Sequence, residues 1–200
     1  MASKGESIVM GKQVEQIALK EWAVSLQALM EGDLIMIMRK GGIEEETKDF
    51  QLMDNRFYLM PAYEHQKEHL LKPQYRHKLA ETLADWTPNM ETIRLQGYAE
   101  VVDDIEIYDS DRLDKLRECH IWEDTFAEER LRWKRKNPLH LLILRVFRLQ
   151  DEIEIPMRSA YNGCKSWVRL EDGAPFREMT PVLTDEQFNR MREKMIALLS

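Results

Sequence analysis

Histidine and glutamate residues at the spacing of a zinc site lie in the segment PAYEHQKEH, residues 61–69. His65, Glu68 and His69 follow the order His-x-x-Glu-His, which on one helix would place both histidines on one face beside a glutamate able to polarise bound water. Pro73 would cut such a helix to about two turns, and no third ligand stands at a recognisable spacing. The sequence therefore predicts neither a bound metal nor a cofactor.

A cysteine offers a second kind of chemistry. Cys164 could be the nucleophile of a hydrolase, because Lys165 and other basic residues surround it and His65 or His140 could serve as the base. A third group that would orient the base cannot be identified, so a buried structural cysteine is the competing interpretation. The catalytic candidates are Glu64, His65 and Cys164, and whether the chain is an enzyme stays open.

Charge is distributed unevenly along the second half of the chain. Residues 100–129 hold twelve acidic and three basic side chains, and residues 130–170 hold ten basic and three acidic ones. Cations contact phosphates and aromatic rings stack on unpaired bases, so the basic segment predicts contact with RNA or single-stranded nucleic acid. The candidate nucleic-acid-binding residues are Arg132, Trp133, Lys134, Arg135, Lys136, Lys165 and Trp167. The alternative is that the two segments neutralise each other.

Composition limits the class of protein. The 200 residues are 44% hydrophobic and carry a net charge of -7, which suits one ordinary domain with a mildly acidic surface. The two cysteines and the polar N-terminus predict a cytoplasmic protein without disulfides, and the apolar runs are too short to cross a membrane. We expect a flexible N-terminus at residues 1–13 and a single compact domain at residues 14–200.

Hydrophobic patterning predicts an α+β fold with a mixed, mainly antiparallel sheet or a small barrel and flanking helices. Alternation predicts a β-hairpin at residues 19–43, with a helix at 14–30 as the alternative, and a second hairpin at 50–61. Residues 14–61 could thus form an N-terminal β-hairpin subdomain. Thr184 and Gln187 predict a capping box that opens a C-terminal amphipathic helix.

The middle of the chain shows both periodicities. A helix is expected after Pro73, and further helices are expected after Asp109 and over residues 125–133. The expected strands are residues 93–101, paired with 105–109, followed by 138–149, 153–156 and 165–170. Gly97 marks a point where backbone or ligand comes close to the sheet.

Several strings in order resemble a bacterial family catalogued as domain of unknown function 1802. They are MRKGGIEE at 38–45, PAYEHQ at 61–66, HIW at 120–122, KNPLHLLILRVFRL at 136–149 and YNGCKSWVRL at 161–170. The resemblance spans about Leu19 to Leu170 and implies no established activity. The strand order is also similar to that of PUA-like barrels, including ASCH and EVE domains, which implies a cleft that binds RNA or modified bases.

The leading hypothesis is a PUA-like nucleic-acid-binding protein for RNA or a modified nucleotide. Arg39, Lys40, Tyr63, Gln66 and Tyr161 are expected to line its cleft. The alternatives are a metal-dependent or cysteine-based hydrolase and a module that binds a protein partner. The sequence leaves the oligomeric state open.

Overall fold

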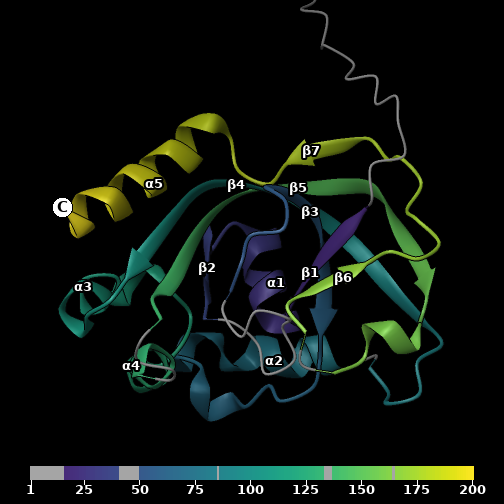
Figure 1. The fold of residues 1–200 in the computed structure, drawn as a ribbon, viewed down its shortest axis with the longest axis horizontal. Helices are drawn as coiled ribbons and strands as arrows, with labels where there is room; N and C mark the ends of the chain where they lie inside the picture. The colour runs from purple at the N-terminus through teal and green to yellow at the C-terminus, as the bar shows by residue number, and fades with distance from the viewer. Residues whose placement is uncertain (1–15, 41–49, 85, 133–136, 164) are drawn as a thin grey trace, which may run out of the picture.

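A mainly antiparallel sheet curves through the molecule, with helices along its faces and ends (Figure 1). The computed structural model describes residues 16–40, 50–84, 86–132, 137–163 and 165–200. The strands are β1 (Ile17–Trp22), β2 (Met36–Arg39), β3 (Arg56–Ala62), β4 (Thr92–Ile107), β5 (Leu139–Pro156), β6 (Trp167–Arg169) and β7 (Met179–Pro181). The α-helices are α1 (Ala23–Glu31), α2 (Arg76–Leu83), α3 (Ser110–Asp114), α4 (Asp124–Arg132) and α5 (Asp185–Leu199). Short 3₁₀ helices span Glu68–Leu70, Pro73–Tyr75, Arg117–Cys119 and Ser159–Tyr161.

The strand order is β2-β5-β4-β3-β1-β6, and β7 also pairs with β5. β1 and β3 are parallel, and the other pairs are antiparallel. Among the described residues no pairing joins β2 to β6, so the sheet stays open rather than closing into a barrel. The expected α+β class with a mixed, mainly antiparallel sheet is confirmed.

The prediction of an N-terminal hairpin is wrong. β1 ends at Trp22 and is followed directly by α1, which ends at Glu31, and β2 pairs with β5 instead of with β1. The alternation from Trp22 to Ala28 belongs to a helix that is buried on almost every side, including Ala23, Val24 and Ser25. Only Gln27 and Glu31 of this helix are not buried, so its polar strip is too narrow for the sequence to distinguish it from a strand.

The prediction of a second hairpin at residues 50–61 is also wrong, because only the part from Arg56 onward is a strand. β3 pairs with β4 and β1, whereas Phe50 is buried against the main core. A turn is nevertheless present before β3: the Oδ1 of Asp54 accepts from the Arg56 N–H at 3.0 Å.

The two longest strands run side by side. β4 has 16 residues and β5 has 18, with register irregularities between Leu95 and Gly97 and between Val101 and Asp103. The expected pairing of residues 105–109 with 93–101 is therefore wrong, because both segments belong to β4. Residues 153–156 likewise continue β5 instead of forming another strand.

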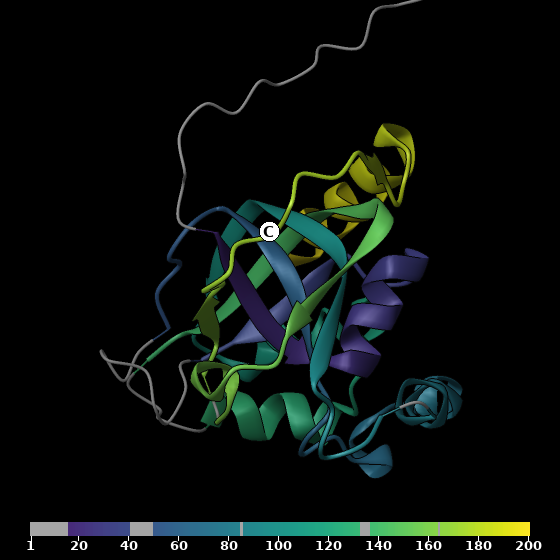
Figure 2. The same cartoon turned by 90° about the vertical axis from the view of Figure 1, so that its right-hand side faces the viewer.

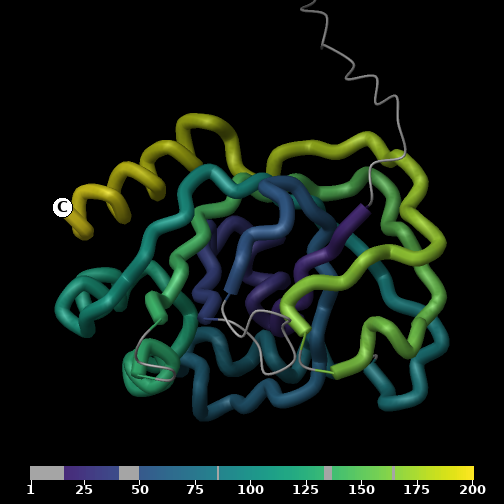
Figure 3. Tube along the Cα trace, viewed as in Figure 1, coloured from purple at the N-terminus to yellow at the C-terminus, as the bar shows by residue number. Residues whose placement is uncertain are grey.

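Helices cover the sheet at different places. α1 lies against it and α2 lies beside α1 (Figure 2), whereas α5 lies at the other end of the molecule from α2 and runs to the C-terminus (Figure 3). The capping box of Thr184 and Gln187 is confirmed, and Asp109 caps α3 by accepting from the Arg112 N–H. No helix in the described ranges is long and apolar enough to span a membrane.

Candidate functional site

The parallel strands β1 and β3 bring two distant segments together. Their register pairs Trp22 with Ala62, so α1, which follows β1, begins beside residues 63–66, which follow β3. The Oε1 of Gln66 accepts from the Val24 N–H at 3.0 Å, and its Nε2 donates to the Tyr63 carbonyl at 3.1 Å. Gln66 therefore fixes this segment against the first turn of α1 and does not line a cleft.

His65 and His69 do not share a helix face, so the expected geometry is wrong. His65 is an exposed turn residue with a φ of 64°, a backbone conformation in which histidine is over-represented. His69 is exposed in the 3₁₀ helix Glu68–Leu70, and an α-helix begins only at Arg76, after Pro73. Within the described parts of the chain, no three His, Cys, Asp or Glu side chains form a group that could hold a metal ion.

A pocket of about 560 Å³ lies next to the end of β3. Its walls come from α1, the end of β3, α2, residues 86–90, the first half of β4 and part of β5. Cavities of roughly 300–1,000 Å³ are typical of small-molecule sites. These elements are far apart in the chain, so the pocket depends on the complete sheet.

The pocket has an apolar floor where α1 meets the sheet. Met30, Leu59, Ile93 and Gly97 line it. A Cβ on Gly97 would lie 2.6 Å from the Met30 sulfur and 3.2 Å from Leu59 Cδ1, so the glycine allows the helix to approach β4. Gly97 is thus a point of close approach, but the groups that approach it are the side chains of Met30 and Leu59 and not the backbone or ligand that was expected.

Two stacked aromatic side chains stand in the pocket wall. The rings of Tyr63 and Trp86 are 5.8 Å apart with an interplanar angle of 22°. Burial raises the pKa of Tyr63, and the positive charge of Arg94 partly offsets that rise. Arg94 thus acts on the Tyr63 hydroxyl through its charge, and the ring pair gives the pocket a flat apolar surface.

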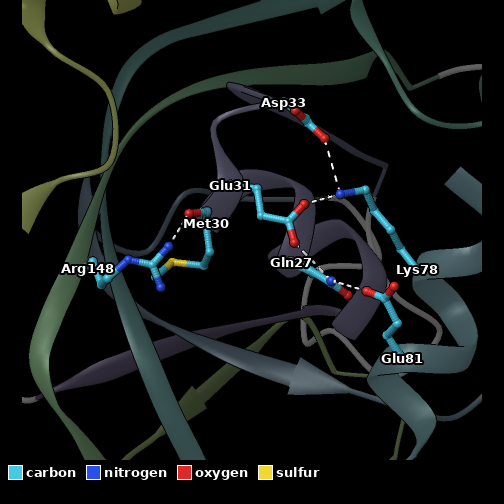
Figure 4. A network of polar contacts seen from close by, with 7 residues as sticks. All are labelled: Gln27, Met30, Glu31, Asp33, Lys78, Glu81 and Arg148. Carbon is cyan, nitrogen blue, oxygen red and sulfur yellow. Dashed lines mark hydrogen bonds and ion pairs between the residues drawn. The ribbon is translucent and has the colours of Figure 1, made fainter.

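Charged side chains of opposite sign line the pocket on different elements. The side chain of Arg94 on β4 is exposed and makes no hydrogen bond or ion pair with the rest of the described chain, and Arg148 of β5 donates to the Met30 carbonyl at the end of α1. Glu31 of α1 and Glu81 of α2 both accept from the amide of Gln27 (Figure 4). The pocket can therefore meet an anionic group on one wall and hydrogen-bond donors on another.

Some of the sequence-predicted residues meet in this pocket. Tyr63, Glu64 and Tyr161 line it. Tyr161 is otherwise buried, and Lys20 Nζ donates to its carbonyl at 2.6 Å and to that of Gly163 at 2.9 Å. Lys20 thereby ties the segment after β5 to β1.

Arg39 and Lys40 are not among the residues that line the pocket. Arg39 is 8% exposed and pairs with Glu21, which is 4% exposed, at 3.1 Å. Lys40 is also buried and donates to the Leu131 carbonyl, and burial lowers the pKa of Lys40. Buried charges need such partners, so both side chains hold the fold together at the end of β2.

The predicted nucleic-acid-binding residues that the structure describes, Arg132, Lys165 and Trp167, also lie outside the pocket lining. Trp167 stacks on Phe50 and donates from Nε1 to the Gln51 carbonyl at 2.9 Å. Lys165 donates to the Ala160 carbonyl at 3.4 Å. Arg132, with its side chain 63% exposed, pairs with Glu128 one turn earlier on α4. Cys164, Trp133, Lys134, Arg135 and Lys136 fall outside the described residues, as does the expected flexible N-terminus.

Ion pairs join the acidic and basic segments at two described places. These pairs are Arg132 with Glu128 and His140 with Asp104. Two other arginines of the basic segment pair with carboxylates outside the acidic segment, namely Arg145 with Asp185 and Arg158 with Asp172. Neutralisation between the two segments is thus partial among these residues.

Sequence reasoning missed Trp86, Arg94, Arg148, Gln27 and Glu81. Arg94 had a recognisable signal, because it alternates with Ile93 and Leu95 and so belongs to the polar face of a predicted strand. The others carry no local signal, since α1 and α2 meet β4 and β5 only in the folded chain.

Comparisons with known proteins give a family and several structural likenesses. Two crystal structures of the ASCH protein from Zymomonas mobilis are similar. A mutant form has a TM-score of 0.43 at 10% identity, covering 90% of this chain and 95% of that one. The other form has a TM-score of 0.42 at 12% identity, covering 93% and 96%. A search of curated proteins found no match.

The family comparison covers most of the chain. The model described as "Domain of unknown function (DUF1802)" matches residues 18–194, which include the pocket and all of the described strands except Ile17 at the start of β1. The chain therefore belongs to the DUF1802 family.

Proposed function

We propose that this protein binds RNA or a nucleotide, and that one unpaired base enters the pocket between α1, α2 and β4. The observation that carries the proposal is the combination in one pocket of stacked aromatic rings, an apolar floor and exposed guanidinium groups. A nucleotide has a flat apolar ring, polar ring edges and an anionic phosphate, and each has a counterpart in this pocket.

The Tyr63 and Trp86 pair supplies the contact for the base. Stacking of an unpaired base on an aromatic side chain contributes about 1–3 kcal/mol and does not depend on base identity. A base within a duplex cannot reach such a surface without leaving its neighbours, so the site favours single strands or flipped bases.

Arg94 supplies the contact for the phosphate. Its guanidinium is exposed, acts on the Tyr63 hydroxyl through its charge and has no carboxylate partner in the described chain. Arginine donates in a planar fork that matches phosphate oxygens. Arg148 would assist with the hydrogens that the Met30 carbonyl leaves available.

A longer strand would also contact the basic segment. The exposed side chain of Arg132 and the cations at 134–136 would bind successive phosphates in this proposal, with Trp133 stacking on a further base. Neutralising residues 132–136 should then weaken RNA binding while leaving the affinity for a single nucleotide unchanged.

Binding measurements on two variants test the pocket. We expect Trp86→Ala to weaken binding of short single-stranded RNA by about 5- to 150-fold, since stacking contributes about 1–3 kcal/mol. Arg94→Ala should weaken binding and reduce the slope of log affinity against log salt by about one. Fluorescence anisotropy of labelled RNA across a salt series measures both effects.

Matched controls separate the pocket from the general surface. Tyr108 is an exposed aromatic residue, 64% accessible, and Arg190 is an exposed arginine on α5. Tyr108→Ala and Arg190→Ala should bind like the unmodified protein. Binding that survives both pocket substitutions, or no binding of any nucleotide or RNA, would refute the proposal.

A further inference from the structure

The wall formed by α1 and α2 presents hydrogen-bond acceptors to the pocket. The Nε2 of Gln27 donates to Glu31 Oε1 at 2.9 Å and to Glu81 Oε2 at 2.8 Å, which uses both hydrogens of the amide (Figure 4). Gln27 therefore holds the two carboxylates in place and has no donor left for a ligand.

The two carboxylates differ in how far they are satisfied. Glu31 accepts from Gln27 on one oxygen and from Lys78 on the other. Glu81 accepts from Gln27 on Oε2, whereas its Oε1 has no partner within the described chain. Glu81 is exposed and lines the pocket, so it is the carboxylate available to a ligand.

We propose that Glu81 reads the base, and that the pocket selects guanine. This inference rests on the proposed function and specifies its ligand. A carboxylate only accepts hydrogen bonds, and guanine presents two adjacent donors, the ring N1–H and the 2-amino group. Glu81 can accept both, one at the unpartnered Oε1 and the other at the second lone pair of Oε2, whose first is used by Gln27. Adenine and cytosine place a ring acceptor beside their amino group, and uracil flanks its single N–H with two carbonyls, so each sets an acceptor against the carboxylate.

Glu81 is placed where it can bind the hydrogen-bonding edge of a base. Glu81 stands on α2, and Arg148 lies on the far side of Met30 from it (Figure 4). A ligand that lies over the apolar floor can therefore direct its base edge to α2 and its phosphate to the arginines of β4 and β5. Hydrogen bonds at the base edge then supply the specificity that stacking lacks.

Calorimetric titration with five nucleoside monophosphates tests this assignment. We expect guanosine monophosphate to bind most tightly. The inosine nucleotide lacks only the 2-amino group and should bind about tenfold more weakly, as expected for the loss of one charge-assisted hydrogen bond. The adenosine, cytidine and uridine nucleotides should bind more weakly still.

Substitution of Glu81 provides the second arm. Glu81→Gln keeps the shape of the side chain but replaces one acceptor oxygen by a donor, so the preference for guanosine over inosine should disappear. Glu81→Asp keeps the acceptor and should retain the preference at lower affinity. Glu193→Gln, an exposed substitution on α5, is the matched control and should leave the order of affinities unchanged.

The outcomes distinguish this inference from the proposed function. Equal affinities for all five nucleotides, abolished by Trp86→Ala, would overturn the guanine assignment and leave nucleotide binding intact. A guanosine preference that persists in Glu81→Gln would also overturn it. If no nucleotide binds and RNA does not bind, both proposals fail.

Discussion

Gln66 performs a task that a helix usually gives to its own first residue. α1 follows β1 directly, and the residue at its N-cap, Trp22, makes no side-chain cap. The Val24 N–H is bonded instead by Gln66, which is 42 positions away in the chain. Residues 61–66, one of the segments that resemble the DUF1802 family, therefore have a structural role, because Gln66 caps the first turn of α1.

Replacement of Gln66 should therefore destabilise the protein. We expect Gln66→Ala to lower the free energy of unfolding by about 1 kcal/mol, the usual loss when a helix cap is removed. Urea unfolding measures the change. Gln74→Ala, at an exposed glutamine, is the control and should have little effect. Equal midpoints for the two variants would show that the Val24 N–H gains nothing from Gln66.

His140 and Asp104 form a second contact whose effect can be measured at one residue. The His140 Nδ1 and the Asp104 Oδ1 are 2.8 Å apart. The negative charge of Glu106 also raises the pKa of His140. The hydrogen bond to Asp104 raises the pKa of His140 above its ordinary value of 6.5, although burial opposes the rise. Because the pKa is raised on folding, the protonated pair stabilises the protein fully below pH 6.5, and this contribution is lost as pH rises through the folded pKa.

An NMR titration of the His140 ring tests this coupling. We expect Asp104→Asn to lower the pKa of His140. The variant should also no longer lose stability as the pH rises through the folded pKa of His140 in the unmodified protein. Identical titration curves in the two proteins would mean that Asp104 does not set the charge of His140.

At the scale of the elements, polar contacts join α2 to α1. Lys78 of α2 binds Glu31 and lies 3.3 Å from Asp33, and Gln27 binds Glu81 (Figure 4). Leu79 is the buried residue of α2, so its apolar anchoring is slight. The position of α2 over the pocket therefore depends on these polar contacts.

Acid should loosen α2. Burial alone would raise the pKa of Glu31, but the hydrogen bonds from Lys78 and Gln27 outweigh it and lower that pKa below 4.5. A pKa that is lowered on folding gives stability that is present above pH 4.5 and is lost as pH falls through the folded value. The loss is at most about 1 kcal/mol, because the pair is partly exposed to solvent. As the pH falls below 4.5, the amides of α2 should become less protected, so that their hydrogen-exchange rates rise relative to those of an unfolded chain at the same pH.

Lys78→Ala should produce the same loosening at neutral pH. Lys194→Ala, at an exposed lysine of α5, is the matched control and should leave exchange in α2 unchanged. If α2 exchanges equally in both variants, apolar packing rather than the ion pairs holds the helix.

The elements also show what local patterns can and cannot predict. The capping box of α5 and the cap of α3 were predictable, because each depends on residues within one turn. β1 and α1 were not, because β1 pairs with β3 and β6, which come much later in the chain, and α1 is buried except at Gln27 and Glu31. In β4 the irregularity near Val101 shifts the alternation of side chains, so one strand reads as two.

The same division applies to the candidate site. Tyr63 and Glu64 were predictable because polar residues after a strand lie at the edge of a sheet. Trp86 was not predictable, because the helix expected after Pro73 ends at Leu83 and Trp86 lines the pocket beyond it. Its role depends on where α2 lies relative to β4, which is set by contacts with α1 and by no pattern around Trp86 itself.

At the scale of the whole molecule, the sheet interleaves the two ends of the chain. β1 lies between β3 and β6, and β2 lies against β5. The segment at residues 14–61 thus contributes three strands, whose partners include β4, β5 and β6. An independent N-terminal subdomain would have to exist without most of those pairings.

We therefore expect residues 14–200 to unfold as one cooperative unit. Tryptophans report on separate places: Trp22 at the start of α1, Trp122 in the main core and Trp167 in β6. Their fluorescence and the far-ultraviolet circular dichroism should give superimposable urea transitions. A chain that begins at residue 62 should lose the cooperative transition, because β4 loses β3 and β5 loses β2 as partners. Two separated transitions, or a truncated chain that still unfolds cooperatively, would instead establish residues 14–61 as a separate folding unit.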